Sequence, residues 1–185
     1  MPKASTATVV APCTAEMYVA PVGTAFPTAS TAVAAPWTSI GYYKSDPTLG
    51  VEIDNTDVTA SNACSPVRSL ITSRTFSWEI EQAQFTKLTI EHFFGAGTWA
   101  ASGTGERWTP NAALAAVEKA FLFDMIDPLG SRTLRILHPR VAFLPSGDIE
   151  WVVDDLVVMP VTATALAPAS GAEIFIDASP ALVAA

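Results

Sequence analysis

The feature that most constrains the fold is a change of hydrophobic period between residues 72 and 95. Over residues 74–81, large apolar side chains alternate strictly with polar ones. The apolar set is Phe76, Trp78 and Ile80, and the polar set is Thr75, Ser77, Glu79 and Glu81. Because successive side chains on a strand point to opposite faces, this period of two predicts a β-strand with one buried and one solvated face.

The residues that follow this strand have the period of an amphipathic helix. Apolar or small side chains recur at intervals of three and four residues from Phe85 onwards, and Gly95 ends the segment. Glycine is common just after the last helical turn because it adopts the required backbone angles without strain. We therefore predict a short helix that folds back over a sheet. Its packing residues are predicted to be Phe85, Leu88, His92 and Phe93.

Short strands separated by turn residues are predicted along most of the remaining chain. They cover residues 17–21, as an edge strand, and 37–43, 51–54, 120–126, 132–137, 141–144, 149–153, 156–164 and 174–177. Residues 96–111 are rich in glycine and predict a flexible connection. Short strands with a single helix indicate a mainly β fold, an antiparallel β-sandwich or barrel with one flanking α-helix.

The length of 185 residues predicts a single domain over residues 1–185. Within it we expect an N-terminal arm over about residues 1–16, a long loop over residues 44–66 and a loose tail over residues 179–185. Long ordered loops in compact domains are usually functional, so residues 44–66 are a candidate contact region.

The composition indicates a subunit that buries part of its surface against others. Charged residues make up 15% of the chain and hydrophobic residues 50%, whereas a charged share of about 25% is usual. The formal net charge of -8 argues against a basic groove for nucleic acid. The long uncharged stretch at residues 17–43 is interrupted by prolines, so we expect no insertion into a membrane.

No residue pattern indicates a reaction centre, and we expect no metal and no cofactor. His92 and His138 lack partners at the spacing of metal ligands, and we interpret both as packed or surface histidines. The carboxylates of Glu79 and Glu81 share a strand face, but no histidine or aromatic platform accompanies them. The acidic pair at residues 154–155 points to opposite faces of a strand, which favours solvated carboxylates.

The order of these features resembles the major tail tube proteins of long-tailed bacteriophages, especially those of actinobacterial hosts. The resemblance spans most of the chain and involves motifs of modest specificity. The segments that carry it are Ala-Pro-Val-Gly-Thr at 20–24, Trp-Thr-Ser-Ile-Gly-Tyr-Tyr at 37–43, the strand and helix from residue 67 onwards, and Leu-Val-Val-Met-Pro-Val-Thr-Ala-Thr-Ala-Leu at 156–166.

This resemblance implies a structural subunit, not an enzyme, made in the host cytoplasm and located in the tail of the virion. In the family, a β-sandwich with a flanking helix assembles into hexameric rings that stack into a tube, and the genome passes through the tube during ejection. The implied partners are further copies of the chain, the tape measure protein, and the tail terminator and baseplate proteins. DNA would pass without specific binding.

The resemblance also implies roles for two surfaces. An acidic, polar wall repels phosphate groups, so the solvated face of the central strand suits the lumen. The residues expected to line the lumen are Thr75, Ser77, Glu79 and Glu81. Contact between rings would fall to the terminal arm and the long loop, whose expected contact residues are Lys44, Asp46, Leu49, Glu52, Asp54 and Asp57.

Two other readings of the sequence stay open at this point. A tube subunit of a contractile injection machine or tail-like particle would share the fold and differ in its surrounding sheath. A monomeric β-sandwich module that binds a glycan or peptide would need exposed aromatic side chains on one face. Trp99 and Trp108 are the candidates for that role.

Overall fold

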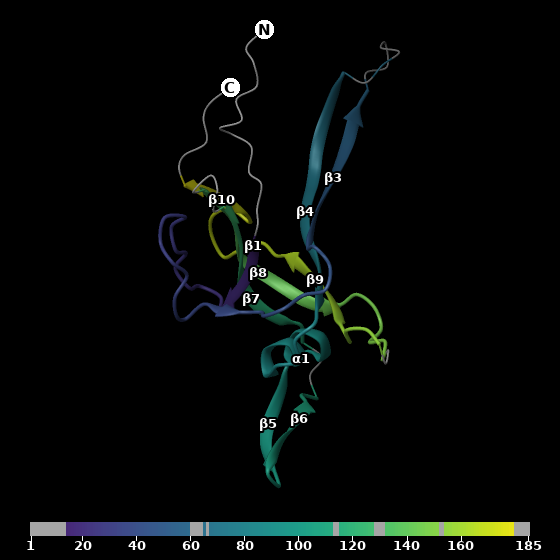
Figure 1. The fold of residues 1–185 in the computed structure, drawn as a ribbon. Helices are drawn as coiled ribbons and strands as arrows, with labels where there is room; N and C mark the ends of the chain where they lie inside the picture. The colour runs from purple at the N-terminus through teal and green to yellow at the C-terminus, as the bar shows by residue number, and fades with distance from the viewer. Residues whose placement is uncertain are drawn as a thin grey trace.

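A computed structural model of the chain describes residues 14–59, 65, 67–112, 115–127, 132–151 and 154–179. These residues form a mainly antiparallel β structure with one helix (Figure 1). The elements are β1 (Thr14–Ala20), β2 (Thr38–Ser39), β3 (Thr48–Val58), β4 (Arg68–Gln82), α1 (Lys87–Phe94), β5 (Gly97–Ser102), β6 (Gly105–Pro110), β7 (Val117–Asp127), β8 (Arg132–Pro145), β9 (Met159–Ala165) and β10 (Phe175–Ser179). The predicted fold class is confirmed.

The main sheet curves into a barrel. Its strand order is β2-β1-β7-β8-β9-β4-β3, and β10 pairs with the first half of β8. The segment after β2 then reaches the far strand β4, where the Lys44 amide donates to the Glu81 carbonyl and the Ala83 amide donates to the Tyr42 carbonyl. Because this segment follows the strand at one edge and also pairs with β4, the sheet closes on itself.

The interior of the barrel is aromatic and centred on Trp78. Its ring lies 4.7 Å from that of Phe123 and 5.5 Å from that of Phe121. The predicted burial of Phe76, Trp78 and Ile80 is confirmed, with exposed fractions of 8%, 2% and 2%. Strict alternation on β4 therefore identified the core face correctly.

A second apolar layer lies on the outer face of β1, β7 and β8. Leu122 and Leu137 are buried there, and the segment of residues 21–37 covers them with Phe26, Val33 and Trp37. Trp37 and Ile40 are buried. The predicted strand over residues 37–43 shrinks to two residues, because Gly41 adopts a φ of 91° that interrupts an extended chain.

Several sequence expectations are corrected by the structure. Residues 96–111 are an ordered hairpin, β5–β6, and not a flexible connection. Strand β1 lies between β2 and β7, so it is not an edge strand. Within residues 44–66, the strand predicted at residues 51–54 extends to the eleven residues of β3. Residues 149–151 have no strand structure, and the rest of that predicted strand lies outside the described residues.

Strand β8 continues through Pro139, where a bend was expected. The pairing of β7 shifts between Lys119 and Phe121, so that two residues of β8 lie opposite one of β7 at the proline. A bulge accommodates a residue that has no amide proton to donate. Most of both expected termini lies outside the described residues, although residues 14–16 of the expected arm belong to β1 and Ser179 ends β10.

Helix α1 closes one end of the barrel. Thr86 caps its N-terminus, and Gly95, with a φ of 89°, ends it. Leu88 and Phe93 pack against the core as predicted. Phe85 precedes the helix and is exposed, which corrects the expectation that it packs.

Both histidines are buried and held by specific partners. His92 stacks on Phe143 at a ring separation of 3.9 Å, and its Nδ1 lies 3.0 Å from the side-chain nitrogen of Gln82. The indole N–H of Trp78 donates to Nε2 of His138 at 3.0 Å, so the proton of His138 sits on Nδ1 and points to the Glu173 carbonyl. Burial lowers the pKa of His138, and burial with the nearby charge of Lys119 lowers the pKa of His92 to about 3.

These histidines predict a loss of stability in mild acid. The unfolded chain takes up a proton on His92 as the pH falls below about 6.5, whereas the folded chain does not until the pH approaches 3. Stability therefore falls with pH in this window, by up to about 1.4 kcal/mol per pH unit for one such histidine. The His92→Phe variant can retain the stack on Phe143. Between about pH 7 and pH 5, its free energy of unfolding in urea should fall by about 2 kcal/mol less than that of the parent. Equal losses would contradict this account.

Candidate assembly surfaces

The solvated face of β4 carries the four residues expected to line a lumen. Thr75, Ser77, Glu79 and Glu81 lie on the face opposite Trp78, with Glu79 exposed and the others half-buried. Thr48 of β3 and Thr162 of β9 lie directly beside Glu79. The structure thus gathers hydroxyl and carboxylate groups on one wall of the sheet.

The β3–β4 hairpin extends far beyond the barrel, at the end of the molecule opposite α1 (Figure 1). Residues 51–58 and 67–74 are all exposed on both faces of this two-stranded ribbon. Its exposed apolar side chains are Val51, Ile53, Val58, Val67, Leu70 and Ile71, with exposed fractions between 39% and 64%. A two-stranded ribbon is marginally stable alone in water, and exposed apolar side chains of this kind are typical of a surface that contacts another molecule.

The residues expected to make contact between rings occupy different environments. Glu52, Asp54 and Asp57 are exposed along β3, as such a contact requires. Leu49 is half-buried and packs against the barrel core. Lys44 forms an ion pair with Asp155, which fixes the segment before β3 to the 154–158 segment. Asp46 is exposed between these regions.

An exposed aromatic pair lies on the flank of the barrel near α1. Trp151 is 76% exposed, and its ring lies 6.2 Å from that of Phe85. Leu156 on the same chain segment is also exposed. Sequence reasoning missed this pair, because Trp151 fell in a predicted strand and Phe85 in a predicted packing face.

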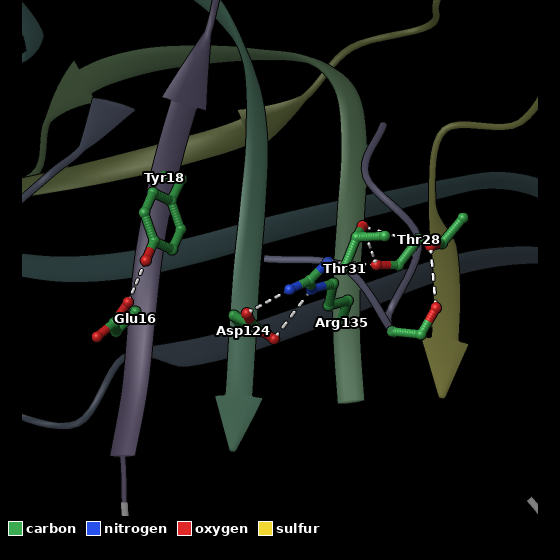
Figure 2. Close-up of polar contacts among 7 residues, drawn as sticks. Glu16, Tyr18, Thr28, Thr31, Asp124 and Arg135 are labelled. Atoms are coloured by element: carbon green, nitrogen blue, oxygen red, sulfur yellow. Dashed lines mark hydrogen bonds and ion pairs between the residues drawn. The ribbon is translucent and has the colours of Figure 1, made fainter. Parts of the chain in front are cut away.

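A buried ion pair fixes the outer layer on the opposite flank (Figure 2). Arg135 of β8 binds Asp124 of β7 through two hydrogen bonds of 3.0 and 3.1 Å, and both side chains are 4% exposed. Arg135 also donates to the Thr28 carbonyl in the covering segment of residues 21–37. On β1, Tyr18 donates to Glu16, and burial with this bond raises the pKa of Tyr18 to about 12. No local sequence signal marks Arg135 and Asp124 as a pair.

The β5–β6 hairpin is fastened to α1 by the tryptophans that might have formed a ligand platform. The Trp99 indole donates to the Glu91 carboxylate at 3.0 Å, and the Lys87 ammonium lies 5.4 Å above the Trp99 ring. Trp108 packs against Phe94 with ring centroids 5.6 Å apart. Both indoles therefore face the helix and not an open binding surface.

The described residues show no group of three or more His, Cys, Asp or Glu side chains that could hold a metal ion. Both histidines are committed to packing and hydrogen bonds, and Asp155 is engaged by Lys44. Within the same residues, no helix combines the length and hydrophobicity that crossing a membrane requires.

A protein family described as phage tail tube protein matches residues 2–178, which is nearly the whole chain. No curated protein sequence matches it.

The buried pair predicts a large cost when one partner is removed. Arg135→Met should lower the free energy of unfolding by about 3–5 kcal/mol, because the Asp124 carboxylate would stay buried without a counter-charge. Adding Asp124→Leu should recover most of that loss. The matched control is Arg140→Met, because the ion pair of Arg140 with Glu118 is far more exposed. This substitution should lower the free energy of unfolding by less than about 1 kcal/mol. Urea unfolding that gives equal costs for both single variants would contradict the assigned role.

Proposed function

Because the chain belongs to the phage tail tube protein family, we propose that it forms hexameric rings that stack into a tube whose acidic lumen conducts DNA during genome ejection. Membership of the family makes it a structural subunit of a multi-subunit tail tube in the virion. The observation that carries the finer proposal is the exposed β3–β4 hairpin. Its bare strand edge and apolar side chains suit a chain whose neighbours complete its structure.

The lumen is assigned to the solvated face of β4. Glu79 and Glu81 lie on this face beside Thr75 and Ser77, and neither carboxylate has an ion-pair partner among the described residues. The chain carries a formal net charge of -8, so each ring adds to the negative potential along the tube. Like charge keeps DNA phosphates from adhering to the wall, which favours sliding over binding.

Contact between rings is assigned to the β3–β4 hairpin and the N-terminal arm. Glu52, Asp54 and Asp57 of β3 are available for this role, and the exposed apolar side chains of the hairpin supply area to bury. Leu49 contributes indirectly, by anchoring the base of the hairpin to the core. The tape measure protein would occupy the lumen before ejection, and terminator and baseplate proteins would cover the two ends of the tube.

Electron microscopy of the purified protein at high concentration tests this proposal directly. Hollow rings or tubes are expected in negative stain, with particle masses from light scattering that are multiples of the 19.5 kDa subunit. Rings of another symmetry would refute the hexamer while leaving the tube. A particle that stays monomeric at every concentration, even with pre-assembled tail tips added as initiators, would contradict the proposal.

The lumen assignment predicts a separable defect in DNA passage. Reversing both charges with Glu79→Lys and Glu81→Lys should leave ring formation intact, because neither side chain is part of the core. Infectivity should fall by on the order of tenfold or more, because cationic side chains along the wall would bind phosphate. The matched control reverses the charges of Asp148 and Glu150 by substitution with lysine, because these two carboxylates lie outside the sheet. Normal infectivity of particles with the Glu79 and Glu81 changes would refute the assignment.

A further inference from the structure

We propose that the distal half of the β3–β4 hairpin docks into an apolar cleft under α1 of a second copy of this chain. The inference rests on the proposed stacking of rings and identifies the receiving surface on the next subunit. It is carried by the matching character of two surfaces at opposite ends of the molecule.

The cleft lies where the end of α1 meets the end of β8. Its volume is about 250 Å³, and it is open to solvent. Its lining is mostly apolar and includes Phe93, Phe94, Ala96, Pro110 and Leu144, with Asn111 as a polar member. Phe94 is 52% exposed, and Leu144 is exposed to a similar degree. An apolar cavity of about 150 Å³ accommodates a benzene-sized group, so the cleft has room for aliphatic side chains.

The hairpin presents aliphatic side chains at the other end of the molecule. Val58, Val67 and Leu70 lie on its distal half and are exposed. The run of residues 51–58 extends roughly 25 Å at about 3.3 Å per residue, so this half lies clear of its own barrel. Within the described part of its own subunit, nothing covers these side chains.

Symmetry requires that the two ends of a stacking subunit be complementary. A head-to-tail contact repeats along an open assembly only if the surface at one end of a subunit fits the surface at the other end. Figure 1 shows α1 and the β5–β6 hairpin at one end and the β3–β4 hairpin at the opposite end. The apolar cleft beside α1 is thus placed to receive the apolar arm of the next copy.

Charge plays a smaller part in the proposed contact. Strand β3 carries Glu52, Asp54 and Asp57 and no basic residue, whereas β4 carries Arg68 and Arg74 in the same hairpin. At the other end, Arg107 on β6 is exposed and has no ion-pair partner among the described residues. The nearby carboxylates Glu91 and Glu106 are already engaged, by Trp99 and Lys87 respectively. Arg107 lies on the strand that contributes Pro110 to the cleft, on the face opposite the cleft, so ionic contact with the next copy would lie outside the apolar contact.

Site-specific photo-crosslinking in assembled tubes tests the contact. A photoreactive phenylalanine analogue replacing Leu70 should crosslink to another copy, within residues 93–96, 110–111 or 143–145, as read by mass spectrometry of the excised dimer. Crosslinks confined to other segments, in tubes that form normally, would overturn the docking site and leave the proposed function standing. If no tubes form from the unmodified protein, the proposed function itself fails, and the docking site with it.

A pair of matched variants gives a second readout. Phe94→Ser removes an exposed aromatic ring from the cleft, and Phe175→Ser removes a comparably exposed ring on β10, away from it. Phe94→Ser should leave single rings but reduce stacked tubes by on the order of tenfold, as expected for an aromatic side chain at a buried contact. Phe175→Ser should stack normally. Stacking by Phe94→Ser at the parental level, with thermal unfolding unchanged, would overturn the inference.

Discussion

The structure depends on the way in which β4 is fixed inside the barrel. Trp78 is buried between Phe121 and Phe123, and its indole N–H donates to His138, whose other ring nitrogen donates to the backbone at Glu173. A buried polar chain of this kind is stable only if each member is satisfied, so it fixes the rotation of β4 relative to β8 and the segment before β10. Because β4 is one continuous strand of fifteen residues, the same anchor orients both its solvated face and its projecting half.

Features that depend on neighbouring residues in the chain could be predicted from the sequence, whereas features that depend on contacts between separate strands could not. The alternation around Trp78 and the helical spacing that ends at Gly95 are local patterns, and both predicted their elements correctly. The β3–β4 arm lacks a buried face, so only residues 51–54 of β3 show an alternation that predicts a strand, and the rest of that segment was expected to be a loop. Asp124 and Arg135 are eleven residues apart on neighbouring strands, and only the register of β7 and β8 shows that they meet.

The distribution of ion pairs bears on the charge of the proposed lumen wall. Lys44, Lys87, Arg135 and Arg140 are each paired with a carboxylate. These pairs hold the segment before β3, the β5–β6 hairpin, the outer layer and the β7–β8 ladder. Four of the ten basic residues are thus used inside the subunit, and carboxylates without an ion-pair partner among the described residues remain on β3 and on the solvated face of β4.

The two hairpins differ in a way that suits opposite roles in one contact. The β5–β6 hairpin is held rigidly against α1 by Trp99, Trp108 and Glu106, so it needs no neighbour to keep its shape. The β3–β4 hairpin has no such support beyond its base, and its exposed apolar side chains lose water only when another subunit covers them. A subunit with one pre-formed end and one end completed by its neighbour gains stability only by adding further subunits in the same direction. The proposed head-to-tail contact therefore repeats from one copy to the next, as a stacked tube requires, and does not pair the same surface of two copies as a two-fold dimer would.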